Sequence, residues 1–94
     1  MEKFLVVLER SETGFSAFSP DAPGCFTVGE TVEGTILNMR EALDLYIEAT
    51  VEAGQDLSNP KGLEYHIQNG LLKKGEIAED YLLTQVEVEL PEMI

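Results

Sequence analysis

The 94-residue sequence has few of the side chains on which catalysis and metal binding usually depend. It contains one cysteine (Cys25), one histidine (His66) and no tryptophan, so no internal disulfide bond can form. The longest apolar run, from Phe4 to Leu8, has the length of a strand and is too short to span a membrane. No phosphate-binding loop, dinucleotide fingerprint or zinc-ligand spacing occurs. We therefore expect a cytoplasmic protein that is not an enzyme and has no catalytic residue, no cofactor and no metal ligand.

Positive charge is also scarce. Six basic residues stand against 18 acidic ones, a net charge of −12. Such a surface repels phosphate backbones and anionic lipids, so we expect no direct binding of nucleic acid or membrane. It attracts a basic protein partner at a rate that falls with added salt. The alternative is that the acidity only keeps a small protein soluble.

The length and composition predict one small domain over residues 1–94. The chain is 44% hydrophobic, which is typical of a globular protein rather than a disordered one. A domain of this size buries a modest share of its surface and has a narrow margin of stability. Association of identical chains would cover the remaining apolar surface, so we expect a homo-oligomer, a dimer or higher.

Four segments have the pattern of strands. Residues 2–9 are apolar on both faces, which predicts a central strand. A turn that ends at Gly14 leads into a returning strand over residues 15–19, and residues 25–29 form a third. The last segment, residues 85–90, alternates strictly. Its predicted inward side chains are Val86, Val88 and Leu90, and its outward ones are Gln85, Glu87 and Glu89.

One long helix is predicted over residues 32–53. Thr31 precedes it as the N-cap, and Gly54 follows in the position that ends a helix. Its apolar residues recur every three or four positions; they are Val32, Ile36, Met39, Leu43, Tyr46, Ile47 and Thr50. The class is therefore α+β, with the order βββα(α)β and the long helix covering one face of the sheet.

Residues 55–83 form a variable segment. We expect a short second helix that starts at Asn59-Pro60, with Leu63, Ile67 and Leu71 on its apolar side. A polar connector over residues 73–80 then leads into the last strand.

A rigid corner connects the second and third strands. Pro20 and Pro23 fix the backbone and bias the preceding residues away from helix. Gly24 lets the chain turn, and Gly29 closes the third strand. The Asp21 side chain is expected mainly to stabilise this turn; a contact with a partner is the open alternative.

The clearest candidate for a binding surface is an acidic face of the long helix. Glu41, Asp44, Glu48 and Glu52 are three or four residues apart and so lie on one side. This face is either a docking surface for a basic partner or an ordinary solvated helix face.

Four other residues have side chains that could take part in chemistry, but the sequence around them does not favour it. A two-metal nuclease would need converging carboxylates, for which Glu9 and Glu30 are remote candidates. His66 has no nucleophile motif around it and is expected on the surface of the second helix. Cys25 is expected to be a small buried hydrophobe.

The corner and its surroundings resemble the N-terminal domain of HicB-type antitoxins. The matching residues are Gly14-Phe15, Pro20-Asp21-Ala22-Pro23-Gly24-Cys25, Gly29-Glu30-Thr31, Asn38 and Glu41-Ala42-Leu43. The resemblance covers residues 3–54 and implies a partial RNase H-like fold. It also implies a partner, a small basic HicA-type toxin that cleaves mRNA and that the antitoxin blocks by steric and electrostatic means.

This chain departs from the family pattern at two places. Ala22 stands where the family usually has leucine, and Gly34-Thr35 replaces a Glu-Ala pair, which we expect to weaken the first turn of the helix. Four residues follow Leu90, so we expect no C-terminal DNA-binding module and no operator binding. The alternatives to an antitoxin are a solitary HicB-like oligomeric binding domain without a toxin and, remotely, a metal-dependent nuclease.

Overall fold

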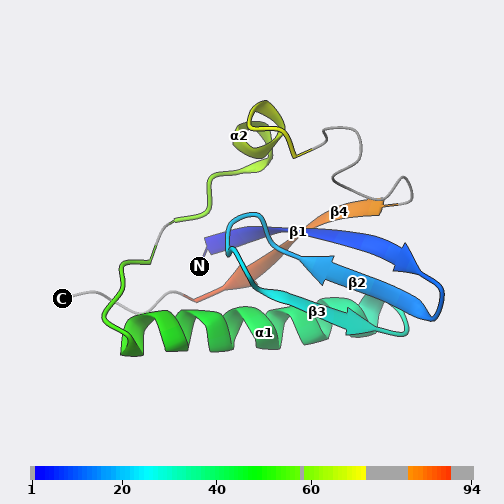
Figure 1. Cartoon of the computed structure of the whole chain (residues 1–94), viewed down its shortest axis with the longest axis horizontal. Helices are drawn as coiled ribbons and strands as arrows, with labels where there is room; N and C mark the ends of the chain where they lie inside the picture. The colour runs from blue at the N-terminus through cyan, green and yellow to red at the C-terminus, as the bar shows by residue number, and fades with distance from the viewer. Residues whose placement is uncertain (1, 58, 72–80, 90–94) are drawn as a thin grey trace.

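The computed structural model describes residues 2–57, 59–71 and 81–89. Three strands come first, followed by two helices and a fourth strand (Figure 1), which confirms the α+β class and the βββα(α)β order. The elements are β1 Glu2–Ser11, β2 Gly14–Phe18, β3 Phe26–Gly29, α1 Val32–Glu52, α2 Leu63–Gln68 and β4 Tyr81–Val88. The strands form one antiparallel sheet in the order β3-β2-β1-β4.

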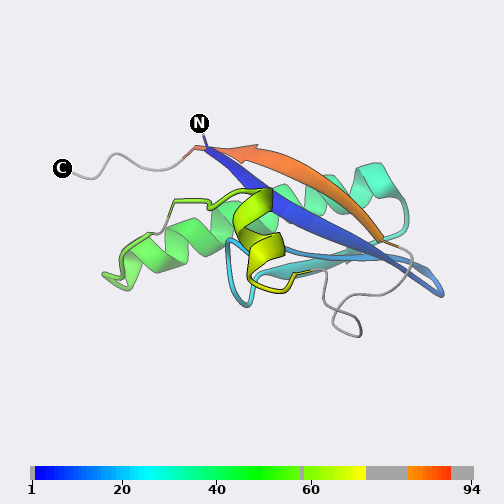
Figure 2. The same cartoon turned by 90° about the horizontal axis from the view of Figure 1, so that it is seen from above.

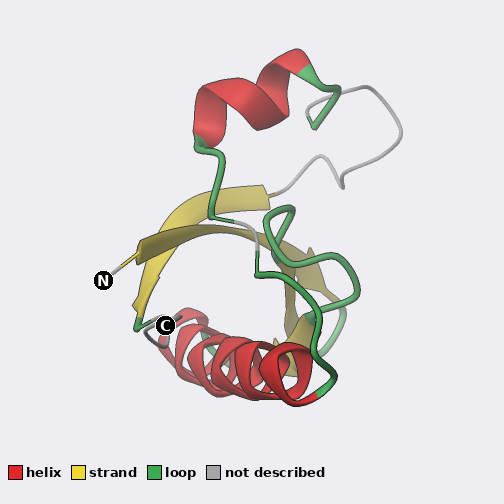
Figure 3. Cartoon of the chain, turned by 90° about the vertical axis from the view of Figure 1, so that its left-hand side faces the viewer, coloured by secondary structure: helices red, strands yellow, loops and turns green. Residues whose placement is uncertain are grey.

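Strand β1 lies inside the sheet, as its two apolar faces predict. Phe4, Val6 and Leu8 point toward α1 and form the core with it. Leu5 and Val7 point to the other face and are buried there as well. Figures 2 and 3 show that α1 and α2 lie on opposite sides of the sheet. Both faces of the central strand are therefore withdrawn from water, which is the main source of stability in so small a domain.

Helix α1 begins and ends as its sequence predicts. The Thr31 hydroxyl accepts a hydrogen bond of 2.9 Å from the Gly34 N–H. At the other end Gly54 has φ +70°, its N–H bonds to the Val51 carbonyl and the Gln55 N–H bonds to the Thr50 carbonyl. These two bonds form a Schellman motif, which satisfies the last carbonyls of the helix.

The buried face of α1 includes one residue that apolar spacing does not identify. Its fully buried positions are Thr35, Met39, Leu43 and Ile47. The Thr35 hydroxyl is satisfied by donating to the Thr31 carbonyl at 2.6 Å. The first turn is thus anchored in the core despite the Gly34-Thr35 departure.

A close approach of backbones fixes where β3 meets α1. A Cβ atom added at Gly29 would lie 2.9 Å from both N and Cα of Thr35 and would clash with its hydroxyl oxygen. A Cβ at Gly14 would clash with the Gly29 carbonyl oxygen. Only glycine fits at these two positions without a shift of the neighbouring backbone.

Two elements begin three or more residues away from their expected starts. Helix α2 begins at Leu63 rather than at Asn59-Pro60, because Gly62 has φ +90° and ψ 163°, outside the helical region. Strand β4 begins at Tyr81 rather than at Gln85, because its first residues pair with Glu9, Leu8, Val7 and Val6 of the long strand β1. Val86 and Val88 are buried as predicted. The expected connector over 73–80 and Leu90 lie outside the described residues.

We expect Gly29→Ala to lower the free energy of unfolding by about 1–3 kcal/mol, because the added methyl group meets backbone atoms that cannot move aside. Denaturant unfolding measures this loss. Gly34→Ala is the matched control: Gly34 is helical, and an added Cβ meets only the Thr31 side-chain oxygen, at 3.0 Å. Equal losses in the two variants would contradict the close-approach argument.

Candidate partner-binding surface

The four predicted carboxylates of α1 lie together on the solvent side of the helix. Glu41, Asp44, Glu48 and Glu52 are all exposed, opposite the stripe that packs on the sheet. Two leucines interrupt them: Leu37 is 60% exposed and Leu45 is 66% exposed. We call this face the α1 ridge and define it by Leu37, Glu41, Asp44, Leu45, Glu48 and Glu52. Contact with water alone would not require large apolar side chains among these carboxylates.

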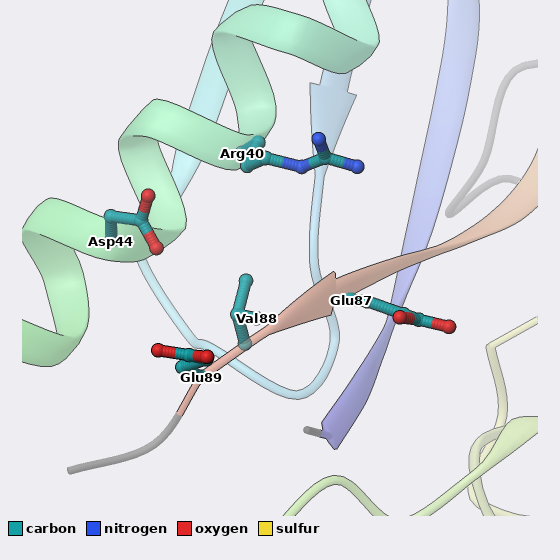
Figure 4. Close-up of a pocket in the computed structure, with 5 residues that line it drawn as sticks. All are labelled: Arg40, Asp44, Glu87, Val88 and Glu89. Atoms are coloured by element: carbon teal, nitrogen blue, oxygen red, sulfur yellow. The ribbon is translucent and has the colours of Figure 1, made fainter.

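One flank of the ridge borders a hollow of about 370 Å³ between α1 and the end of β4. Its lining residues are Arg40, Asp44, Glu87, Val88 and Glu89 (Figure 4). Val88 points toward the helix while Glu87 points away from it, as the pleat of a strand requires. The residues that line the hollow include three acidic ones and one arginine, an excess of negative charge, although the Glu87 carboxylate points away from the helix.

Asp21 is not on the ridge. Its side chain is 1% exposed, and its carboxylate accepts three hydrogen bonds. Oδ2 accepts from the Leu5 N–H at 2.9 Å, and Oδ1 accepts from the Lys61 N–H at 2.9 Å. Oδ1 also lies 2.6 Å from Nε2 of His66. The carboxylate thus joins the corner loop to β1 and to the segment around α2. A contact of Asp21 with a partner protein stays a prediction.

The local turn is stabilised by Ser19 rather than by the Asp21 side chain. The Ser19 hydroxyl accepts a hydrogen bond of 3.3 Å from the Asp21 N–H, and the Ser19 carbonyl accepts one of 3.1 Å from the Ala22 N–H. Ala22 itself is fully buried in the core. The turn thereby directs the Asp21 carboxylate inward, where long-range donors meet it.

The charge state of Asp21 follows from these contacts. Burial raises the pKa of the Asp21 carboxyl, but hydrogen bonds from the Lys61 and Leu5 amides and from His66 lower it by more. The net result is a pKa below the ordinary value of 3.8. Asp21 is therefore ionised at neutral pH and acts purely as a hydrogen-bond acceptor.

The prediction that His66 lies on the surface is wrong. His66 is 8% exposed, whereas Leu63 and Ile67, which were expected on the packed side of the helix, are 37% and 43% exposed. The helix is rotated so that the imidazole reaches the Asp21 carboxylate. No local spacing signals this pair, because the two residues are 45 positions apart.

The lone thiol behaves as the sequence predicts. Cys25 is free and buried, and burial raises the pKa of its thiol. A thiol of raised pKa is a poor nucleophile at neutral pH. Its role is to pack in the core beside the corner.

The remaining candidates are not brought together. Glu9 lies on β1 and Glu30 follows β3, with β2 between the two strands. In the part of the chain that the structure describes, no three His, Cys, Asp or Glu side chains are placed to hold a metal ion. Across the same residues no helix is both long and apolar enough to cross a membrane.

Comparison with known proteins gives concordant matches. Residues 4–92 match the family of HicB-like antitoxins of bacterial toxin–antitoxin systems. The fold is similar to that of the N-terminal domain of the Burkholderia pseudomallei antitoxin HicB (TM-score 0.73, 27% identity, 94% of this chain and 99% of that one). It is equally similar to a chain of a solved HicA3–HicB3 toxin–antitoxin complex (TM-score 0.73, 30% identity, 93% and 98%).

A curated relative is less informative about function. An uncharacterized 14.9 kDa protein of Haemophilus phage HP1 is 29% identical over 89 residues, which is 95% of this chain. The match spans 62% of the length of that phage protein.

We expect Asp21→Ala to lower the free energy of unfolding by about 3 kcal/mol, because it leaves buried donors without an acceptor. Equilibrium unfolding in urea measures this change. Asp56→Ala removes an exposed aspartate and serves as the control, with an expected change within about 0.5 kcal/mol. A comparably small effect at position 21 would show that water replaces the carboxylate without cost.

Stability also depends on pH through this carboxylate. Because its pKa is lower in the folded chain than in the unfolded chain, the stabilisation is complete above the ordinary value of 3.8 and is lost as the pH falls through the folded pKa. The difference in unfolding free energy between wild type and Asp21→Asn should therefore stay large near neutral pH and shrink below 3.8. A difference that does not change with pH would contradict the assignment.

Proposed function

Because this chain belongs to the family of HicB-like antitoxins of bacterial toxin–antitoxin systems, we propose that it binds a small basic HicA-type toxin and blocks its cleavage of mRNA. In this proposal the chain performs no chemistry of its own. It acts in the cytoplasm by covering the toxin surface that receives RNA.

The observation that carries the proposal is the composition of the α1 ridge. A protein that binds RNA presents cations to the phosphates. Four exposed carboxylates along one helix offer the same cations an alternative anionic surface, and the net charge of −12 attracts a basic protein from a distance. A bound antitoxin of this kind excludes RNA both by occupying the site and by repelling its phosphates.

The two exposed leucines give the ridge a means of holding its partner. Charge complementarity mainly speeds association, whereas buried apolar anchors mainly slow dissociation. Leu37 and Leu45 stand among the carboxylates, so one surface supplies both effects. The acidic hollow beside Asp44 is suited to a lysine or arginine side chain at the edge of the contact.

A structural relative supports a toxin as the partner. The HicA3–HicB3 complex contains a chain that this protein matches at 30% identity over 93% of its length. A solitary HicB-like binding domain is the competing hypothesis, and the two differ in what the protein captures. A tagged pull-down from the native host at low salt should recover a small basic protein that raised salt releases; recovery of the bait alone would favour the solitary domain.

We expect the double variant Glu41→Lys/Glu48→Lys to weaken the complex with the HicA-type toxin about 100-fold, because two attractive contacts become repulsive. Affinity is measured by calorimetry or surface plasmon resonance, and inhibition by RNA cleavage in the presence of the variant.

The matched control is Glu12→Lys/Glu64→Lys. These exposed glutamates lie in the β1–β2 turn and on α2, away from the ridge, and the change in net charge is the same. The control should mainly slow association. Equal losses of affinity in both variants would mean that total charge, and not the ridge, determines binding.

A further inference from the structure

The hairpin of β2 and β3 is an uncharged surface on an acidic chain. Residues 13–29 contain a single charged residue, Asp21, whose side chain is 1% exposed. The whole chain of 94 residues has six basic and 18 acidic residues, so charge is dense outside this stretch. The neutral stretch is therefore a distinct patch on the surface.

The patch also carries two strongly exposed apolar side chains. Phe26 is 71% exposed and Val28 is 65% exposed, although both belong to a strand. Phe26 pairs with Phe18 and Val28 pairs with Ser16, so the two side chains share a face of the sheet. Ala17, between those partners on β2, packs in the core against α1; Phe26 and Val28 therefore point away from α1.

The backbone edge of β3 is partly occupied. Among the described strands β3 forms one edge of the sheet, but Nδ2 of Asn38 donates a hydrogen bond of 2.9 Å to the Val28 carbonyl. A strand added at this edge would have to displace Asn38. Side-chain packing is thus the more accessible form of contact here than continuation of the sheet.

Charge determines which partner fits such a patch. In a twofold contact between identical chains, a surface of one copy faces the same surface of the other copy. Two acidic surfaces placed in this way repel each other. The α1 ridge is unsuitable for self-contact for this reason. A basic toxin gains no attraction from a neutral patch, and an anionic membrane is repelled by the chain as a whole. By register, the nearest charged positions are Glu9, two strands away on the same face, and Glu30 just after β3.

We propose that Phe26 and Val28 on β3 form the contact between two copies of this chain, related by a twofold axis. The contact buries the exposed apolar side chains of the hairpin and leaves the α1 ridge of each copy on the surface. This inference names the face used for self-association and does not depend on the binding of a toxin.

Sedimentation equilibrium of the full chain, from micromolar to millimolar concentration, tests the proposal. The wild type should dimerise, and Phe26→Glu/Val28→Glu should raise the dimer dissociation constant at least about tenfold, because it brings buried like charges together. Leu37→Glu/Leu45→Glu is the matched control, since those leucines are 60% and 66% exposed. It should leave the dimer unchanged.

A milder variant tests whether loss of the dimer could result from misfolding. Phe26→Thr/Val28→Thr places β-branched side chains, which suit a strand, at both positions and removes most of the apolar contact. It should also weaken the dimer, while circular dichroism shows an unchanged fold. A wild type that stays monomeric at millimolar concentration would overturn the proposal, as would loss of the dimer in the α1 control alone.

The salt dependence of the affinity distinguishes this dimer contact from the proposed binding of a toxin. Added salt screens repulsion between two acidic copies and should strengthen the dimer, whereas it should weaken a complex with a basic protein. A variant that no longer dimerises but still inhibits RNA cleavage would show that the two surfaces act separately. Failure to dimerise would leave the antitoxin proposal standing, and failure to bind a toxin would leave the dimer contact standing.

Discussion

The buried carboxylate of Asp21 is the interaction on which the arrangement of this domain depends. The pairing of β1 with β2 ends at Val7 and Phe18. The Leu5 N–H therefore lies beyond the β1–β2 ladder and needs another hydrogen-bond acceptor. Asp21 supplies it, and its second oxygen accepts from the Lys61 amide and contacts His66. One side chain therefore completes the hydrogen bonding of the central strand and fixes the segment that leads through α2. The same carboxylate on the surface would add only one more charge to an acidic chain.

The acidic surface and the neutral surface of this domain are separate. The α1 ridge concentrates carboxylates on the side of the sheet that α1 covers. The hairpin of β2 and β3 has no exposed charged side chain between residues 13 and 29, and its exposed side chains Phe26 and Val28 point to the other side. The proposed binding of a basic partner uses the first surface, and the proposed self-association uses the second, which is free of like charge. In a small domain of net charge −12, these two proposed contacts are compatible because the two surfaces are separate.

Local sequence predicted the elements whose signals are local. Thr31 caps α1 and Gly54 ends it because a hydroxyl and an unhindered φ are properties of single residues. The alternation that buries Val86 and Val88 is likewise set by strand geometry. The start of β4 was predicted too late, since Tyr81 joins the strand only because β1 is long enough to pair with it. His66 was placed on the wrong face because its partner is distant in the chain.

The sequence by itself determined the class of fold, the caps and core stripe of α1, the acidic charge of that helix and the resemblance of the corner to HicB-type antitoxins. These properties are encoded by residues near one another in the chain, where spacing and propensity act directly. Tertiary structure alone decided that Asp21 is buried with His66 and that Phe26 and Val28 face away from α1. Each of those outcomes depends on the register of strands or on contacts between segments far apart in sequence, and such contacts are fixed only when the whole chain folds.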